Sequence, residues 1–238
     1  IYPVIVMFRG FVPSDIYESG MGTQPSAALF SQQGFITLAP DFLGYGESDK
    51  PSSDSFEDRF ETYTTALSLL SSLKTLNTQL QQKYKGTITA DVNDVQLWGH
   101  SNGGHIALVA LALTGKQYPT VLWAPVSKSF PYSILYYTDE YDDQGKATRK
   151  ALADFEKLYD VQAFSPPRYY RFITAPLAIF QGGTDQEVLP WWSSELAEQL
   201  KKYKLDITYT QYHNADHNLQ PDGWSSAVAS SISFYQTW

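Results

Sequence analysis

One serine in this sequence is enclosed by glycines where a short apolar run gives way to a helical pattern. The stretch 98–105 reads WGHSNGGH, with Ser101 near its centre. The apolar run 95–98 precedes it, and the helical pattern 106–113 (IALVALAL) follows it. In a strand–turn–helix this tight, only small neighbours fit, and the serine hydroxyl is raised above the sheet at the start of a helix. The pattern therefore predicts a nucleophile rather than a chance Gly-x-Ser-x-Gly turn.

A serine hydroxyl becomes a good nucleophile only when a base takes its proton, and histidine is the usual base. The chain has four histidines. His100 is expected to pack beneath the turn, and His105 is expected to face along the following helix. His217 lies in the loop 214–219 after the last apolar run, where it can reach over the edge of a sheet. We therefore predict His217 as the base, with His213 as the alternative.

The base needs a carboxylate that holds it in one tautomer. Asp185 follows an apolar run and two glycines in the stretch QGGTDQEV, and it is the first candidate. Glu187 and Asp216 are the alternatives, and each of the three could instead be a solvated loop carboxylate. The order Ser101, Asp185, His217 is the chain order of an α/β-hydrolase triad.

Short apolar runs alternate with helical patterns along the chain. Strands are expected at 2–8, 35–39, 95–98, 120–124, 177–180 and 207–212. Helices are expected at 26–32, about 56–83, 102–113, 147–159, 192–203 and 224–235. The alternation predicts a single α/β domain over 1–238, with a mostly parallel sheet and helices on both of its faces. The aromatic-rich segment 126–172 is longer than an ordinary helical crossover, and we interpret it as a cap-like insertion.

Composition argues against several classes of partner. The net charge of −8 and the absence of a basic cluster argue against nucleic acid. No apolar run approaches the roughly 20 residues of a membrane span. The lack of cysteine excludes disulfides, thiolate metal sites and cysteine nucleophiles. The sequence begins at Ile1 without an initiator methionine, so secretion after removal of an upstream signal peptide is compatible with it. Nothing in the sequence specifies the compartment or the oligomeric state.

No metal or cofactor is expected. Asp139, Glu140, Asp142 and Asp143 could hold calcium, but they lack EF-hand spacing. A solvated acidic loop is therefore the preferred interpretation of this segment.

The chain resembles the α/β-hydrolase superfamily over nearly its whole length, and within it the catalytic domain of the prolyl oligopeptidase family and its esterase relatives. Besides the serine motif, four segments in the same order carry the resemblance. They are 41–48 (DFLGYGES), 165–177 (from Ser-Pro to ITAPL), 182–188 (GGTDQEV) and 216–219 (DHNL). The resemblance implies that the first strand here is the third of the family's sheet, so two antiparallel edge strands are expected to be missing upstream.

The resemblance also implies an oxyanion hole made of two backbone N–H groups. Asn102 matches the first position, and Phe11 is the candidate for the second. Relatives usually carry His-Gly before this second donor, whereas this chain has Arg9 and Gly10. We expect Arg9 either to bind a substrate carboxylate or to pair with an acid such as Asp41.

These observations together predict a serine hydrolase that works through an acyl-enzyme on a small-molecule ester. The insertion 126–172 leaves the carboxyl edge of the sheet, where ligands bind in open α/β folds. We expect Tyr132, Tyr136 and Tyr137 to line a pocket for short acyl or aryl esters, including hydroxycinnamoyl esters. The insertion's aromatic residues could equally form its own core.

Peptidase relatives carry a separate propeller domain, for which 238 residues leave no room. A peptidase is therefore the alternative, and a catalytically inactive binding module is the alternative from another class.

Overall fold

The apolar runs form one parallel sheet. The computed structural model describes residues 1–238, and its strands are ordered β2-β1-β3-β4-β5-β6, with every neighbouring pair parallel. The strands are β1 (Tyr2–Phe8), β2 (Ile36–Leu38), β3 (Ala90–His100), β4 (Thr120–Trp123), β5 (Leu177–Gly182) and β6 (Ile207–Tyr212). The α/β-hydrolase fold predicted from the sequence is confirmed.

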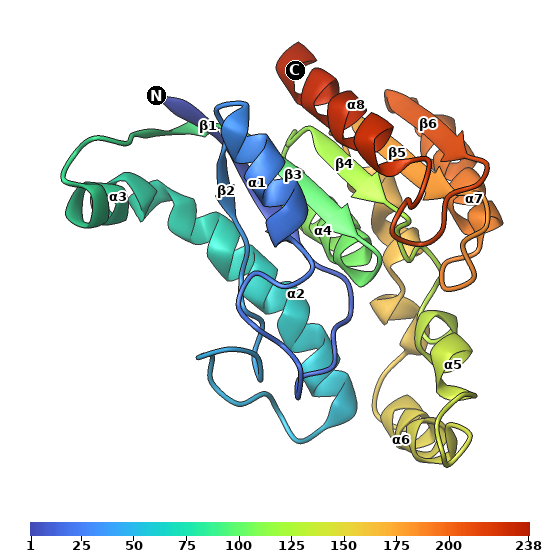
Figure 1. Ribbon diagram of the computed structural model, residues 1–238. Helices are drawn as coiled ribbons and strands as arrows, with labels where there is room; N and C mark the ends of the chain where they lie inside the picture. The colour runs from blue at the N-terminus through green and yellow to red at the C-terminus, as the bar shows by residue number, and fades with distance from the viewer.

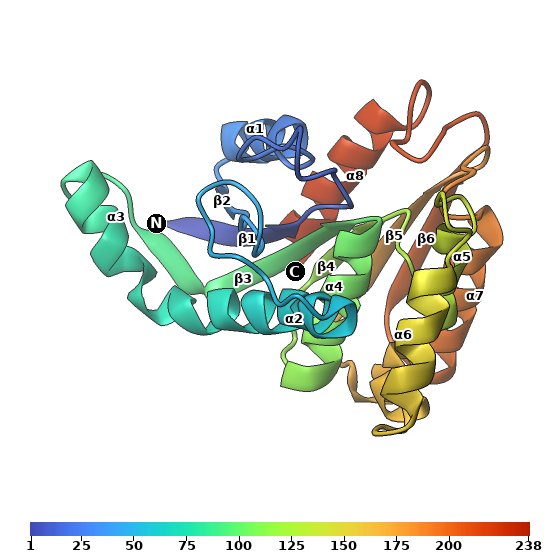
Figure 2. The ribbon, with the colours of Figure 1, turned by 90° about the horizontal axis from the view of Figure 1, so that it is seen from below.

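Helices cover both faces of this sheet. The α-helices are α1 (Gln24–Gln32), α2 (Ser55–Ser72), α3 (Leu76–Tyr84), α4 (Asn102–Thr114), α5 (Tyr132–Thr138), α6 (Lys146–Glu156), α7 (Pro190–Lys202) and α8 (Trp224–Thr237), and the 3-10 helices are η1 (Leu73–Thr75), η2 (Val161–Phe164) and η3 (Pro166–Phe172). Helices α1 and α8 lie on one face of the sheet, and α2, α4 and α7 lie on the other (Figures 1 and 2). No helix combines the length and the apolar character that crossing a membrane requires.

Strand β1 shows how one apolar run serves both faces of the sheet. Val4, Val6 and Phe8 belong to the hydrophobic cluster shared with α2, α4 and α7. Ile5 and Met7 belong to the cluster shared with α1 and α8. All five side chains are fully buried. A parallel strand between two helical layers must be apolar at nearly every position, which explains why this run lacks polar alternation.

The long helix predicted over 56–83 is interrupted. Helix α2 ends at Ser72, the turn η1 follows, and α3 begins at Leu76. The side chain of Asn77 donates to the carbonyl of Ala90 (3.0 Å) and accepts from its N–H (2.8 Å). These two bonds tie α3 to the start of β3, so a tertiary contact outweighs the continuous helical pattern.

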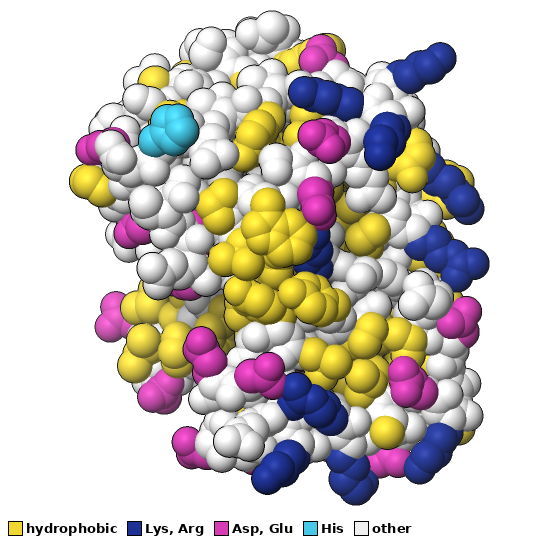
Figure 3. Space-filling view, turned by 90° about the vertical axis from the view of Figure 1, so that its right-hand side faces the viewer, with side chains coloured by type: hydrophobic (Ala, Val, Ile, Leu, Met, Phe, Trp, Pro, Cys, Tyr) yellow, Lys and Arg dark blue, Asp and Glu magenta, His cyan; other side chains and the backbone are white.

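Much of the aromatic content of the segment 126–172 forms a core of its own. Phe130, Phe155 and Phe164 pack with Phe56 and Phe60 of α2. Figure 3 shows hydrophobic side chains gathered in the middle of the face on which α5, α6 and α7 lie, with many of the charged side chains around them. The aromatic residues of this segment therefore stabilise it as well as shaping its surface.

The acidic loop after α5 is engaged in local contacts. Asp139 pairs with Arg149 of α6. Asp143 accepts hydrogen bonds from the backbone N–H groups of Gly145 (2.8 Å) and Ala147 (2.7 Å). The contacts of these two carboxylates thus fix the loop to the start of α6.

Candidate active site

Ser101 occupies the sharp turn between β3 and α4. Its φ of 56° and ψ of −122° lie in a region that residues other than glycine rarely adopt, so the backbone there is strained. Two backbone hydrogen bonds hold the turn: the N–H of Ser101 donates to the carbonyl of Trp123 (2.9 Å), and its carbonyl accepts from the N–H of Val126 (3.0 Å). The serine is therefore fixed at the carboxyl edge of the sheet, where it lines a cavity of about 350 Å³.

The glycines around the serine make room for this turn. A β-carbon at Gly99 would lie 2.5 Å from the carbonyl oxygen of Gly103. A β-carbon at Gly103 would lie 1.8 Å from the carbonyl oxygen of Phe8, at the end of β1. Both distances are far inside van der Waals contact, so a side chain at either position would push α4 away from the sheet.

His217 and Asp185 form a buried pair. Nδ1 of His217 lies 2.9 Å from Oδ2 of Asp185. The other carboxylate oxygen accepts from the N–H groups of Glu187 and Val188, both at 2.9 Å, and Nε2 of Gln181 donates to Oδ2, also at 2.9 Å. These bonds fix the orientation of the carboxylate. Because it can only accept from His217, it keeps the proton of the ring on Nδ1 and leaves Nε2 free to accept another.

A glycine at the end of β5 allows the histidine loop to cross that strand. A β-carbon at Gly182 would lie 2.0 Å from the carbonyl oxygen of Asp216. The loop after β6 therefore passes directly over the end of β5. This close approach brings His217 to Asp185, although the two residues come from different connections.

The ring of His217 is linked to the serine turn through His100. The two imidazole centroids are 4.7 Å apart, and Nε2 of His100 donates to the carbonyl of His217 (3.0 Å). Nε2 of His217 lies 3.7 Å from Oε2 of Glu187, a residue that lines the same cavity as Ser101. The hydroxyl of Ser101 makes no hydrogen bond within the protein, so it is free to turn.

The alternative base and acids are placed differently. His213 is exposed and has no carboxylate within ion-pair distance. Asp216 accepts from the backbone N–H groups of Asn218 (2.8 Å) and Gln220 (2.9 Å), and so shapes the loop. Glu187 is exposed and lies on the Nε2 side of the base rather than on the Nδ1 side.

Two histidines near the site, the half-buried His100 and the buried His105, resist protonation. Burial, assisted by the nearby His217, lowers the pKa of His100 to about 4. Burial, assisted by the guanidinium of Arg59, lowers the pKa of His105 to about 3. His105, which was expected to face along α4, is buried. Its Nε2 accepts from the hydroxyl of Tyr63 (2.8 Å), and its Nδ1 lies 3.2 Å from the carbonyl of Val126.

We expect the free energy of unfolding to fall as the pH is lowered from about 6.5 towards 4. An unfolded histidine takes up a proton near pH 6.5, whereas folded His105 does so only near pH 3. The contribution of His105 to the free energy of unfolding is therefore complete above pH 6.5. Below pH 6.5 this contribution is lost at up to about 1.4 kcal/mol per pH unit. His105→Gln should flatten the dependence measured by urea unfolding between pH 4 and 7. If the free energy of unfolding depended on pH equally steeply in the variant and in the wild type, this expectation for His105 would be wrong.

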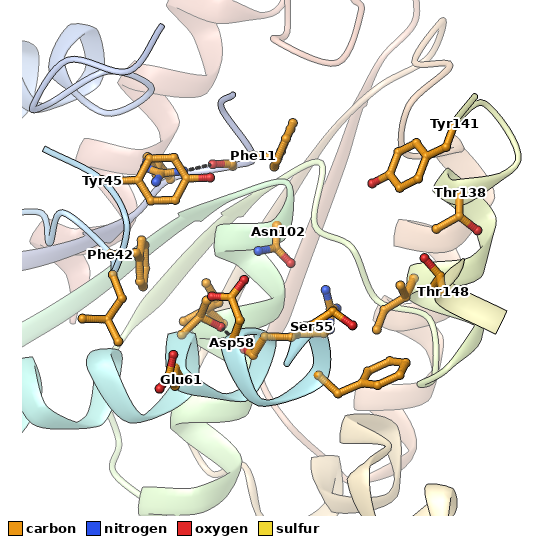
Figure 4. Close-up of a pocket in the computed structure, with 18 residues that line it drawn as sticks. Phe11, Phe42, Tyr45, Ser55, Asp58, Glu61, Asn102, Thr138, Tyr141 and Thr148 are labelled. Atoms are coloured by element: carbon orange, nitrogen blue, oxygen red, sulfur yellow. Dashed lines mark hydrogen bonds between the residues drawn. The ribbon is translucent and has the colours of Figure 1, made fainter. Parts of the chain in front are cut away.

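Two backbone N–H groups flank the serine. Asn102 is the first residue of α4, so its N–H has no acceptor within the helix. The N–H of Phe11 makes no hydrogen bond within the protein. Gly10 packs against the serine, since a β-carbon there would lie 2.9 Å from Cβ of Ser101. Figure 4 shows Phe11 and Asn102 on opposite sides of one hollow. Both N–H groups thus lack a backbone acceptor.

Arg9 does not form the predicted ion pair with Asp41. Its guanidinium is buried against aromatic rings, 4.0 Å from the centroid of Tyr45 and 4.6 Å from that of Tyr17. Asp41 accepts instead from the hydroxyls of Tyr17 and Ser19. The rings stabilise the cation from its faces, and the hydroxyls occupy the carboxylate.

The polar contact of Arg9 is made within its own loop, which follows β1. Nη1 of Arg9 donates to the carbonyl of Gly10 at 2.9 Å, a bond that is dashed in Figure 4. The carbonyl of Gly10 and the N–H of Phe11 belong to one trans peptide and point in opposite directions. The bond therefore turns the N–H of Phe11 away from Arg9.

Only one of the three tyrosines predicted to line the pocket does so. The cavity is lined by Phe11, Arg59, Ser101, Asn102, Val126, Ser133, Ile134, Tyr137, Glu140, Tyr141 and Glu187. Tyr132 and Tyr136 lie one turn apart on α5 and pack on Trp192, with centroid distances of 6.0 and 4.9 Å. Tyr137 projects from another side of the helix, and its hydroxyl donates to the carbonyl of Glu187 (3.1 Å). The expectation for Tyr132 and Tyr136 was wrong because periodicity could not fix the rotation of this short helix.

Sequence reasoning missed several residues that line the cavity, Arg59 and Ser133 among them. Arg59 carried a usable signal, because it lies three residues after Phe56 and four before Tyr63. These spacings place the positive charge of Arg59 within the apolar stripe of α2. A charged side chain there is unfavourable unless a partner or a ligand interacts with it. Ser133 carried no such signal.

Comparisons with known proteins identify relatives among both peptidases and esterases. A Caenorhabditis elegans protein described as dipeptidyl peptidase family member 6 is 27% identical over 139 residues, which are 55% of this chain and 18% of that protein. A puromycin-hydrolyzing peptidase of Mycobacterium tuberculosis superposes with a TM-score of 0.69 at 18% identity, over 100% of this chain and 34% of the other. Est1E from Butyrivibrio proteoclasticus, solved with ferulic acid bound, superposes with a TM-score of 0.64 at 16% identity, over 99% of this chain and 88% of the other.

The chain therefore spans less than two thirds of the length of both peptidase relatives. At such low identity, the likeness to solved structures shows the shared fold. The family evidence is separate: the model of the prolyl oligopeptidase family matches residues 23–238. Since that match extends over almost the whole chain, this protein belongs to the prolyl oligopeptidase family and has the α/β-hydrolase fold.

Proposed function

We propose that this protein cleaves carboxylic esters through an acyl-enzyme, with Ser101 as nucleophile, His217 as general base and Asp185 as the group that orients the base. The observation that carries the proposal is the buried His217–Asp185 pair. Nε2 of His217 lies 3.7 Å from Oε2 of Glu187, and Glu187 lines the same cavity as Ser101.

The proposed reaction follows from this placement. Nε2 of His217 takes the proton of the Ser101 hydroxyl as the oxygen attacks the ester carbonyl. The N–H groups of Phe11 and Asn102 stabilise the oxyanion that develops. The alcohol leaves with the proton from His217, and a water molecule then repeats the sequence on the acyl-enzyme and releases the acid. Arg9, in this account, holds the Phe11 peptide in place rather than contacting the substrate.

The walls of the cavity support a small aryl or acyl substrate. Rings and aliphatic side chains from Phe11, Val126, Ile134, Tyr137 and Tyr141 line it. Its volume of about 350 Å³ suits a small molecule, and the rings in its walls suit aromatic or short acyl chains. Short acyl and aryl esters, hydroxycinnamoyl esters among them, are the proposed substrates.

A peptidase that removes residues from a free amino terminus is the second candidate. Glu140 and Glu187 both line the cavity, and carboxylates there could bind a substrate ammonium group. Two of the relatives are peptidases by description. On this alternative, the same triad would attack an amide.

A substrate panel separates the two candidates. We expect aryl esters of graded acyl length to be cleaved with a rate enhancement over the uncatalysed reaction that exceeds the enhancement for aminoacyl anilides. Glu187→Gln should then affect charged aminoacyl substrates and their N-acetylated forms equally. A larger enhancement for the anilides, lost selectively in Glu187→Gln, would replace the esterase proposal with the peptidase.

A further inference from the structure

The cavity at Ser101 contains one positively charged side chain, and that charge has no carboxylate within ion-pair distance. Arg59, from α2, lines this cavity and the adjoining one of about 350 Å³. Arg59 takes part in no ion pair, and its Nε and Nη2 are buried without a hydrogen-bond acceptor. Burial raises the pKa of the nearby Tyr63 hydroxyl, and the guanidinium of Arg59 opposes that rise. Buried guanidinium nitrogens without acceptors are unfavourable, so this position favours a ligand that supplies them.

The nearby carboxylates do not neutralise this charge. Burial, together with Glu61, raises the pKa of Asp58, whereas a guanidinium partner would lower it. Glu61 accepts from the N–H of Ser52 (2.9 Å). Figure 4 shows Asp58 and Glu61 on α2, below Asn102. Glu140 and Glu187 line the cavity, but both are exposed. Arg59 thus remains the cavity's unpaired cation.

Ser133 is a second unpartnered group in the same cavity. It belongs to α5 and is only 2% exposed, and its Oγ makes no hydrogen bond. Most buried hydroxyls in folded proteins have a hydrogen-bond partner, so this one is an exception. The two groups come from separate elements, α2 and α5, and line one cavity.

We propose that Arg59 and Ser133 form a subsite for a carboxylate group carried by the substrate. The two oxygens of a carboxylate can accept from a guanidinium and a hydroxyl together. The exposed Glu140 and Glu187 would repel a doubly charged group such as a phosphate more strongly, so a single negative charge fits best. The substrate class is an ester that carries a second, ionised acid group, such as a monoester of a dicarboxylic acid. The reaction at this ester rests on the proposed function, whereas the anion site does not.

A matched pair of esters tests the subsite. The probes are the 4-nitrophenyl monoester of adipic acid, with a free carboxylate, and its neutral methyl diester, both corrected for uncatalysed hydrolysis. We expect the wild type to prefer the monoester in kcat/KM. Arg59→Gln should reduce the monoester-to-diester ratio by roughly 10- to 100-fold, because a charge-assisted bond is lost. Ser133→Ala should reduce it by about 3- to 10-fold without changing the charge.

The control is Arg171→Gln, which removes the same charge from an exposed arginine that does not line the cavity. It should leave the ratio unchanged. Circular dichroism and thermal unfolding show whether each variant is folded. If Arg59→Gln does not fold, the monoester-to-diester ratio of Ser133→Ala tests the subsite instead.

A binding measurement separates this proposal from the proposed function. The dissociation constants of both esters are measured on the intact chain carrying Ser101→Ala, alone and combined with Arg59→Gln. If the wild type hydrolyses neither ester, the esterase proposal fails, yet tighter binding of the monoester that depends on Arg59 still supports the subsite. A ratio of rates or dissociation constants that a folded Arg59→Gln or Ser133→Ala protein leaves unchanged overturns it.

Discussion

Ser101→Ala is expected to lower kcat by several orders of magnitude, on the order of 10⁶-fold where the nucleophile of a comparable triad has been removed. Only a hydroxyl is lost, from a side chain that makes no hydrogen bond within the protein, so the fold and the melting temperature should be retained. His217→Ala should lower kcat almost as far. The double variant should be no worse than either single one, because the residues act as a unit.

The matched control is His213→Ala, at the exposed alternative base. It should keep nearly full activity in steady-state assays with an aryl ester. Near wild-type turnover by Ser101→Ala would show that Ser101 is not the nucleophile. A large loss of activity in His213→Ala would show that His213, rather than His217, is the base.

Asp185→Asn is expected to lower kcat on the order of 10⁴-fold, the loss seen when a triad aspartate is changed in this way. The amide oxygen of the new side chain can still accept from the N–H groups of Glu187 and Val188. Its NH₂ group then faces both Nδ1 of His217 and Nε2 of Gln181, which are donors in the wild type. A donor at this position favours the tautomer with the proton on Nε2, and that tautomer cannot accept the serine proton.

Glu187→Gln is the control for this change, because Glu187 contacts the opposite nitrogen of His217. It should alter kcat for a neutral ester only a few-fold. Steady-state kinetics of the two variants on one ester compares them directly. If Glu187→Gln were the damaging change and Asp185→Asn the mild one, the orienting acid would be Glu187.

Local sequence was sufficient for the parts of this molecule that are built locally. In a strand–turn–helix, the glycines around Ser101 make room for a tight turn, so the turn could be predicted. The strained backbone of Ser101 agrees with that prediction. Strand β1 was predicted to the residue because a doubly covered strand must be apolar throughout. The parallel sheet followed from the alternation of strands and helices.

Features that depend on tertiary contacts could not be predicted in the same way. The break between α2 and α3 accompanies the bonds of Asn77 to β3, which no periodicity reveals. Pairing of Arg9 with Asp41 was a reasonable expectation from charge alone, but aromatic rings surround the cation instead. Arg59 lies far from the serine motif in sequence and reaches the cavity only through the packing of α2 against α4.

The most direct test of the central claim, an activated nucleophile at Ser101, is covalent labelling by a fluorophosphonate. The intact protein is treated at neutral pH, and mass spectrometry of the whole chain and of its peptides locates the adduct. We predict one adduct per chain, on Ser101, absent from Ser101→Ala and formed much more slowly by His217→Ala. A wild-type protein that stays unlabelled, or that is labelled at another residue, would contradict the account, and an unlabelled protein would indicate a hydrolase fold that only binds.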